Sequence, residues 1–429
     1  MILILNYLLF VVYLVVLCWL LLRLPVIQSL GLDKKTVLAL FLCKIVAGIA
    51  IGWVSIHIYG PGNDYWDLND AAWKEYQLLI TDPGAYFSNI FTSGYPDGYG
   101  GLFSSFDSYW NDLKGNLLIK LVSLFNIFSR GDYYINSLFF NFIIFFGHVV
   151  FYKLFVAVFK ERKWLVVVGC FLIPSTLYFT SGMHKDGLVF LLLAVLIYCV
   201  YRWLQQNKLT VKRLLLIVIC SILLFLVRNY IFISLAPALL AWVITQKTKW
   251  KPALVFLAVY FIAGLLVFNV DDIFPKIKPL DIIITRQTEF LNLPHTETSI
   301  SLTPLQPTCK SFAANAPQAL NHLLLRPYLW ELPVQTILPL NIELFICQLL
   351  LLLYILYHKK IKENPVSCLI YFLVFFCITI FLLIGYIVPN LGSLVRYRAV
   401  YLPLIITPLL CLIQWEKVPL FNKIKILNM

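Results

Sequence analysis

The stretch LLLIVICSILLFLVRNYIFISLAPALLAWVI, residues 214–244, decides how this chain folds. It is apolar almost throughout, and its one charged residue, Arg228, lies near the middle beside Asn229. One straight helix of this length would span about 46 Å, against a hydrocarbon core of about 30 Å. Two helices that turn at Arg228 and Asn229 would each be slightly short for a membrane span. The stretch is therefore either one overlong span or a hairpin whose turn lies within the membrane profile.

The composition of the whole chain agrees with a membrane protein. Of its 429 residues 61% are hydrophobic and only 13% are charged, although the net charge is +13. Soluble domains carry about a quarter charged residues, because their surfaces must stay hydrated. Long apolar blocks with few charges are typical of membrane spans. These features exclude a disordered chain, a basic nucleic-acid-binding domain and an ordinary soluble enzyme.

The distribution of Lys and Arg decides between the two interpretations of 214–244. With a hairpin, the basic clusters between the spans all fall on one side of the membrane, as expected of cytoplasmic loops. A single helix would move every cluster after residue 244 to the other side. We therefore predict one all-α domain over residues 1–429, with about eleven transmembrane helices in a cytoplasmic (inner or plasma) membrane. The expected spans are 2–22, 37–59, 134–158, 164–180, 187–201, two within 214–244, 252–270, 336–357, 366–388 and 399–415.

This topology puts the N-terminus outside and the C-terminus in the cytoplasm. It leaves two long extracytoplasmic loops, 61–133 and 271–335. The first alternates apolar and polar residues in a pattern typical of amphipathic helices in the membrane interface. The second has no readable motif, and we expect it to cap a site and to select an acceptor.

Carboxylates open the first long loop directly after a span. The spacing of three between Asp64, Asp67 and Asp70 places them along one broad side of a helix. Such a carboxylate can act as a general base or hold a divalent cation. The structural alternative is a solvated helix start, where acidic residues meet the positive end of the helix dipole.

A short turn between two expected spans carries His184, Lys185 and Asp186. A cation beside a titratable His and an acid suits phosphate binding or proton transfer. A turn that merely caps both helices is the alternative.

Arg228 lies deep in apolar sequence, beside Asn229, and needs an anion or water there. The structural alternative is an ion pair with an acid such as Glu343, itself inside an expected span.

Two further arginines, Arg396 and Arg398, stand at the outer end of the last span. The guanidinium group matches phosphate oxygens in a bidentate manner. The alternative is contact of these side chains with lipid headgroups.

The layout resembles the GT-C class of polytopic membrane glycosyltransferases and related bacterial polysaccharide transferases and polymerases. The resemblance lies in Asp64 right after a span, in the stretch from Pro174 to Asp186, and in the segment from Asn390 to Arg398. It implies Asp64 as catalytic base or metal ligand, with Asp67 as the substitute. It also implies Lys185, Arg228 and Arg396 as the binding groups for a polyprenyl-phosphate sugar donor.

The residues and the resemblance together predict transfer of a sugar from such a donor to a glycan or lipid acceptor outside the cell. The metal remains open, with a divalent cation as one candidate cofactor, and the other partners are membrane lipids and no nucleic acid. A polysaccharide polymerase and a transporter or flippase of a lipid-linked or anionic solute remain as alternatives. Candidate catalytic residues are Asp64 and Asp67, candidate donor-binding residues are His184, Lys185, Arg228, Arg396 and Arg398, and candidate supporting residues are Asp70, Asp186, Asn229 and Glu343.

Overall fold

A computed structural model describes residues 2–92, 109–248, 250–275, 278–328, 331, 338–359 and 364–419. Parts of both expected long loops, among them residues 93–108 and 332–335, lie outside the described residues. Within the described ranges every regular element is a helix, and the only other pairings are the isolated bridges Ser299–Asn390 and His358–Ile413. The all-helical fold class is thereby confirmed.

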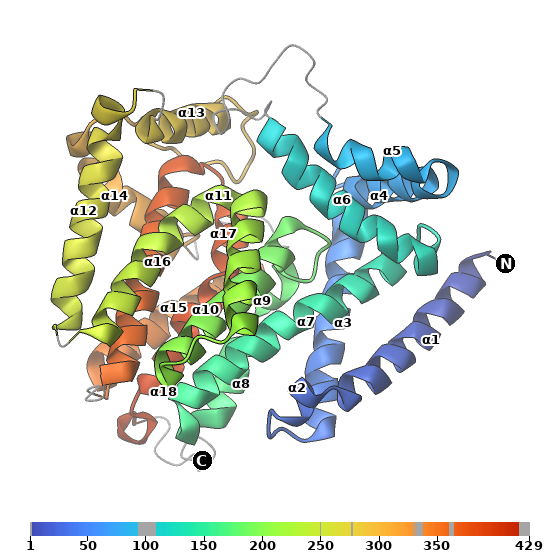
Figure 1. Cartoon of the computed structure of the whole chain (residues 1–429), viewed down its shortest axis with the longest axis horizontal. Helices are drawn as coiled ribbons and strands as arrows, with labels where there is room; N and C mark the ends of the chain where they lie inside the picture. Colours follow the sequence, from blue (N-terminus) through green and yellow to red (C-terminus); the bar gives the residue numbers. More distant parts are fainter. Residues whose placement is uncertain are drawn as a thin grey trace.

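Figure 1 shows the helices running mostly between an upper and a lower end of the molecule. Their bounds are α1 Ile2–Arg23, α2 Pro25–Gln28, α3 Lys34–His57, α4 Asp64–Thr81, α5 Pro83–Ser88, α6 Tyr109–Ser129, α7 Tyr133–Val158, α8 Lys163–Phe171, α9 Pro174–Phe179, α10 Lys185–Gln206, α11 Val211–Lys247, α12 Pro252–Ile273, α13 Pro279–Leu291, α14 Cys309–Leu324, α15 Leu338–Tyr357, α16 Asn364–Ile387, α17 Leu391–Ala399 and α18 Leu402–Leu412. Three short 3₁₀ helices occupy Asn89–Phe91, Lys160–Arg162 and Trp415–Lys417. In the view of Figure 1, α4, α5, α6 and α13 lie toward the upper end.

Eight of the helices in the described residues are long and apolar enough to cross a membrane. They are α1, α3, α7, α10, α11, α12, α15 and α16. The pair α17 and α18, bent by 65°, adds a ninth if it is counted as one span. The expected number of eleven passes stays a prediction.

The long helix α11 folds back on itself at Arg228. Arg228 has the non-helical angles φ −150° and ψ 84°, which divide α11 into two arms. Arg228 contacts Asp186 at the start of α10, whereas the Lys247 ammonium lies 5.0 Å from the ring centroid of Trp203 near the end of α10. Because α11 begins just after α10 ends, it must run the length of α10 twice. The hairpin expected at Arg228 and Asn229 is therefore present.

The expected span over 164–180 is not one continuous helix. It is divided into α8 and α9 by a break at Leu172 and Ile173, just before Pro174. Proline has no backbone N–H and disfavours helical geometry in the residue before it, so the helix ends there.

An apolar outer shell surrounds the helix bundle. Leucine, isoleucine, phenylalanine and tryptophan side chains are exposed along α1, the first arm of α11, α12 and α15, for example Phe261 and Ile355. In water so large an apolar surface would drive association, whereas lipid tails would cover it at no cost. The exposed shell and the spans together support a multi-pass membrane protein.

Inside the bundle, the fully buried Lys44 connects α3 to the turn between α9 and α10. Its ammonium donates to the hydroxyls of Thr180 at 3.0 Å and Ser181 at 3.1 Å. The side chain amide of Asn141 on α7 donates to the Ser181 carbonyl at 2.8 Å. Polar side chains of two spans thus fix the turn that precedes His184.

Candidate functional site

The turn before α10 is held in place from a third side by α4. A Cβ atom on Gly182 would lie 2.4 Å from Cε1 of Tyr65, so only glycine allows the Tyr65 ring to pack against this turn. His184 then caps α10, with extended backbone angles and a side chain that lies close to the Asp186 N–H. These local contacts fix His184, Lys185 and Asp186 at one end of the helix bundle.

Asp186 is the centre of the site and is fully buried. Its Oδ1 accepts a hydrogen bond from the Arg228 guanidinium, and its Oδ2 accepts from Arg396 Nε at 2.8 Å. His184 Nδ1 lies 3.0 Å from the same Oδ2. A buried carboxylate is costly unless it is paired and hydrogen-bonded, and here two arginines supply both requirements.

Arg228 reaches Asp186 from the turn of the α11 hairpin. Its second nitrogen donates to the Tyr230 hydroxyl at 2.8 Å, and its guanidinium carbon lies 5.0 Å from the ring centroid of Tyr397. The side chain oxygen of Asn229 accepts from the Tyr230 backbone N–H at 2.8 Å. The non-helical turn is thus what brings a cation from the middle of an apolar stretch to the site.

Arg396, on α17, contacts three other members of the cluster. Besides Asp186, it donates to Asp64 Oδ2 at 3.1 Å and to His184 Nε2 at 2.7 Å. Its guanidinium carbon also lies 5.7 Å from the centroid of the Tyr65 ring. Arg396 therefore joins α4, α10 and α17.

Asp64 is the part of the cluster that faces outward. It is the first residue of α4, which is capped by Asn63, and 62% of its side chain is exposed. Its Oδ2 lies 3.8 Å from His184 Nε2. An exposed carboxylate beside a buried cationic cluster can meet a hydroxyl that approaches from outside.

His184 contacts both a carboxylate and a guanidinium of the cluster through its ring. Nδ1 lies 3.0 Å from Asp186 Oδ2 and 2.8 Å from a guanidinium nitrogen of Arg396, and Nε2 lies 2.7 Å from the same nitrogen. Burial, and then the positive charge of Arg396, lower the pKa of His184 to about 4. The imidazole is thus neutral at pH 7, and the positive charge of the cluster comes from its arginines and lysines.

Two lysines at the site have no carboxylate within 4.0 Å among the described residues. One is Lys185, at the start of α10, and the other is Lys114 on α6. Burial, and then repulsion by Lys185, Arg286 and Arg228, lower the pKa of Lys114 to about 7. Sequence reasoning missed Lys114, and no local signal distinguishes it from the other lysines of the first long loop.

Four predicted residues lie outside this cluster. Asp67 and Asp70 are exposed on α4 and form no ion pair or hydrogen bond with the described residues of the cluster. Glu343 binds the backbone N–H and hydroxyl of Ser175, both at 2.5 Å, so it is not the partner of Arg228. Arg398 is buried and donates to the carbonyl oxygens of Leu323 at 2.8 Å and Arg326 at 2.9 Å.

No group of three or more metal-ligating side chains occurs in the part of the chain that the structure describes. The carboxylates of Asp64 and Asp186 are each bound by arginine. The chemistry that the cluster offers directly is therefore the binding of an anion by arginine and lysine.

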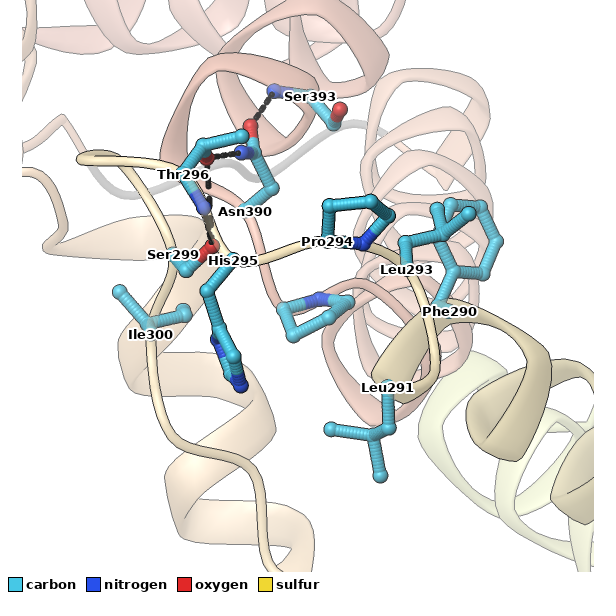
Figure 2. A pocket seen from close by; sticks show the side chains of 11 residues that line it. Phe290, Leu291, Leu293, Pro294, His295, Thr296, Ser299, Ile300, Asn390 and Ser393 are labelled. Carbon is cyan, nitrogen blue, oxygen red and sulfur yellow. Dashed lines mark hydrogen bonds between the residues drawn. The ribbon is translucent and has the colours of Figure 1, made fainter.

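A cavity of about 140 Å³ lies where the segment after α13 crosses the start of α17 (Figure 2). Asn390 joins the two segments, because its amide donates to the hydroxyls of Thr296 at 3.0 Å and Thr298 at 2.8 Å. The lining is apolar on one side and polar on the other, and consists of Phe290, Leu291, Leu293, Pro294, His295, Thr296, Ser299, Ile300, Pro389, Asn390 and Ser393. Ser393 lies one helical turn before Arg396, which places the cavity beside the cluster along α17.

Comparison with known proteins adds a family description to this geometry. Residues 116–302 match a family described as "Predicted membrane protein (DUF2142)". No curated protein matches the chain, and no solved structure matches it. The matched residues include the turn before α10 and the α11 hairpin, whereas Asp64 and Arg396 lie outside them. The helical fold, the apolar shell and the matched family thus support a multi-pass membrane protein over these residues.

Proposed function

We propose that this protein is a membrane glycosyltransferase that moves a sugar from a polyprenyl-phosphate-linked donor to a glycan or lipid acceptor on the extracytoplasmic face. The observation that carries the proposal is the cluster of Arg228, Arg396 and Lys185 around Asp186, directly beside the exposed carboxylate of Asp64. A lipid-linked phosphate sits at headgroup level, and these cations lie at the end of the helix bundle.

The distribution of basic residues supports the extracytoplasmic orientation. Lys153 donates to the Ser29 hydroxyl at 2.9 Å, Lys163 donates to the Gly31 carbonyl, and Arg162 lies 3.6 Å from Glu416. These basic residues belong to the end of the bundle away from Asp186. Because cytoplasmic loops are enriched in Lys and Arg, that end would face the cytoplasm. Eleven passes follow if the α11 arms count separately and α8–α9 and α17–α18 count as broken spans.

In the proposed reaction the acceptor hydroxyl loses its proton to Asp64 as its oxygen bonds to the anomeric carbon. The bond from that carbon to the donor phosphate oxygen breaks, and the phosphate leaves with the electron pair. Arg228, Arg396 and Lys185 stabilise the charge that develops on the leaving phosphate. Because Arg396 binds Asp64, an arriving phosphate that attracts Arg396 would release this carboxylate for its role as base.

The cavity beside α17 is the proposed entry of the acceptor. Its apolar side offers a surface for a sugar ring, and its hydroxyl, imidazole and amide groups offer partners for sugar hydroxyls. Asp67, the substitute base in the family resemblance, lies one helical turn from Asp64 and forms no ion pair among the described residues, so Asp64 is the better candidate.

The role of Asp64 is tested with Asp64→Asn, with Asp70→Asn as the matched control. Asp64→Asn should lower the amount of glycan product in membranes at least 100-fold while expression and folding persist, because only the carboxylate can accept the proton. Asp70→Asn, on the same helix but outside the cluster, should leave the product unchanged. Product formation retained in Asp64→Asn would contradict the role of Asp64 as the base.

A transporter or flippase of an anionic lipid is the second candidate, and one observation favours it. α11 is broken at Arg228, α8–α9 is broken, and α17–α18 is bent, and transporters commonly bind solutes at such interrupted helices. A transporter would move an intact labelled lipid-linked sugar across reconstituted vesicles, whereas the enzyme would release the polyprenyl carrier. Translocation without release of the carrier would favour the transporter.

A further inference from the structure

The start of α6 packs directly against α11 beside the site. The ring centroid of Trp110 lies 5.2 Å from that of Phe225. Phe225 precedes Arg228 by three residues, so the first turns of α6 lie next to the hairpin turn. Lys114 follows Trp110 by four residues and therefore occupies the same side of α6.

Lys114 differs from the next lysine of the same helix. Lys120 forms an ion pair with Glu75 and donates to the carbonyl oxygen of Tyr86. Lys114 is also partly buried, but the charges that act on it are those of Lys185, Arg286 and Arg228, and all three are cations. Among these, Arg286 is paired with Glu289 at 2.9 Å. When it is protonated, Lys114 has no matching negative charge among the described residues, so an anion that binds beside it would stabilise its charge.

The charges of the cluster indicate how many negative charges that anion carries. Four cations, Arg228, Arg396, Lys185 and Lys114, stand against the carboxylates of Asp186 and Asp64, while His184 is neutral. When both lysines are protonated, the described residues of the cluster therefore carry two unmatched positive charges. A sugar linked to a lipid by one phosphate is a diester with a single negative charge, whereas a diphosphate link carries two.

We propose that the donor of this site is a lipid-linked sugar diphosphate, with Lys185, Arg228 and Arg396 at one phosphate and Lys114 at the other. This inference rests on the proposed function and specifies its substrate class. In the transfer step the bond from the anomeric carbon to the nearer phosphate breaks, the acceptor proton moves to Asp64, and the lipid diphosphate leaves with one further negative charge. Lys114 would stabilise that charge in the transition state.

Binding of two short lipid probes to the purified full-length protein in detergent tests the proposal. The probes are geranylgeranyl diphosphate and geranylgeranyl monophosphate, and binding is measured by displacement of a fluorescent analogue. The wild-type protein should bind the diphosphate about tenfold more tightly than the monophosphate, or more, since charge-assisted hydrogen bonds to phosphate are strong. Lys114→Gln should remove most of this preference and leave monophosphate binding unchanged.

The control is Lys74→Gln, which changes an exposed lysine on α4 and should keep the preference for the diphosphate probe. Lys114→Arg preserves the positive charge and should also keep it, which makes the test independent of whether Lys114→Gln folds well. Equal affinity of the wild-type protein for both probes, or an equal loss for both in Lys114→Gln, would overturn the proposal.

The same measurements separate this inference from the proposed function. If the wild-type protein transferred sugar from a monophosphate donor only, the proposed glycosyltransferase activity would be supported and the proposed diphosphate donor would be contradicted. If no sugar were transferred from either donor but the binding preference for diphosphate still depended on Lys114, the proposed diphosphate-binding site would be supported and the proposed glycosyltransferase activity would be contradicted.

Discussion

At the scale of single residues, the site is organised around one buried carboxylate and the neutral imidazole beside it. Asp186 is fully buried and faces two arginines, so His184 contributes a hydrogen bond without adding a third positive charge. This arrangement depends on the imidazole staying unprotonated, which makes it sensitive to acid.

The stability of the folded protein should therefore fall as the pH is lowered from about 6.5 to about 4. The pKa of His184 is about 4 in the folded protein, against an ordinary value of about 6.5 in the unfolded chain. Between these values the unfolded chain binds more protons, so the free energy of unfolding decreases as the pH falls. The contribution of this residue is about 3 kcal/mol. Melting temperatures in detergent between pH 4 and pH 7 would measure it.

His184→Gln should flatten that pH dependence, whereas His295→Gln, at an exposed position, should reproduce the wild-type curve. Parallel curves for wild-type protein and His184→Gln would show that the acid sensitivity has another origin.

Most of the charged residues that the structure brings together could be picked out from the sequence alone, but their pairing could not. Asp64, His184, Lys185, Arg228 and Arg396 were recognisable because ionisable groups at span ends are unusual. The partner of Arg228 could not be chosen between acids, since that choice depends on how α10 packs against α11. Tyr65 and Lys114 gave no signal, because an aromatic ring and a lysine are ordinary in an interfacial loop.

At the scale of helices, the α11 hairpin was predictable and the α8–α9 break was overlooked. Because lysines and arginines accumulate on one side of the membrane, their positions indicate whether this stretch crosses once or returns as a hairpin, and Arg228 marked the position of the turn. Pro174 was equally visible in the sequence, but a break of two residues leaves the apolar pattern of a span almost unchanged. Hydropathy thus detects a span without showing whether its helix is continuous.

Docking of α4 on the turn before α10 depends on Gly182, and Gly182→Ala tests this contact. The new methyl group would lie 2.4 Å from Tyr65 Cε1 and 2.9 Å from Ile51 Cδ1. Overpacking of this kind costs about 1–3 kcal/mol, and it would also move Asp64 away from Arg396. We expect a lower melting temperature together with reduced product formation.

Gly115→Ala on α6 is the control, because a Cβ there would meet no atom within 4 Å among the described residues beyond its own helix backbone, and alanine favours a helix. It should leave the melting temperature unchanged or raise it slightly. A Gly182→Ala protein as stable and active as the wild type would mean that α4 tolerates displacement at this contact.

At the scale of the whole molecule, the two ends of the helix bundle should be exposed to different compartments. Cys309 is exposed at the start of α14, where the Tyr386 hydroxyl near the end of α16 donates to the Phe312 carbonyl at 2.7 Å, and this end of the bundle is the one proposed to face outward. A membrane-impermeant maleimide should therefore label Cys309 in intact cells. Lys208 is exposed between α10 and α11. In a Cys309→Ser protein that also carries Lys208→Cys, the new cysteine should be labelled only after permeabilisation. The reverse pattern would contradict the proposed orientation.

Arg396 holds together helices that come from widely separated parts of the chain. Its side chain bridges Asp64 on α4 and Asp186 on α10 while its own helix continues into α18 through a 65° bend. If the site binds an anion as proposed, that anion would compete with Asp64 and Asp186 for this guanidinium and weaken the attachment of α4 to the helix bundle. Anion binding and the position of α4 would then be coupled through a single side chain.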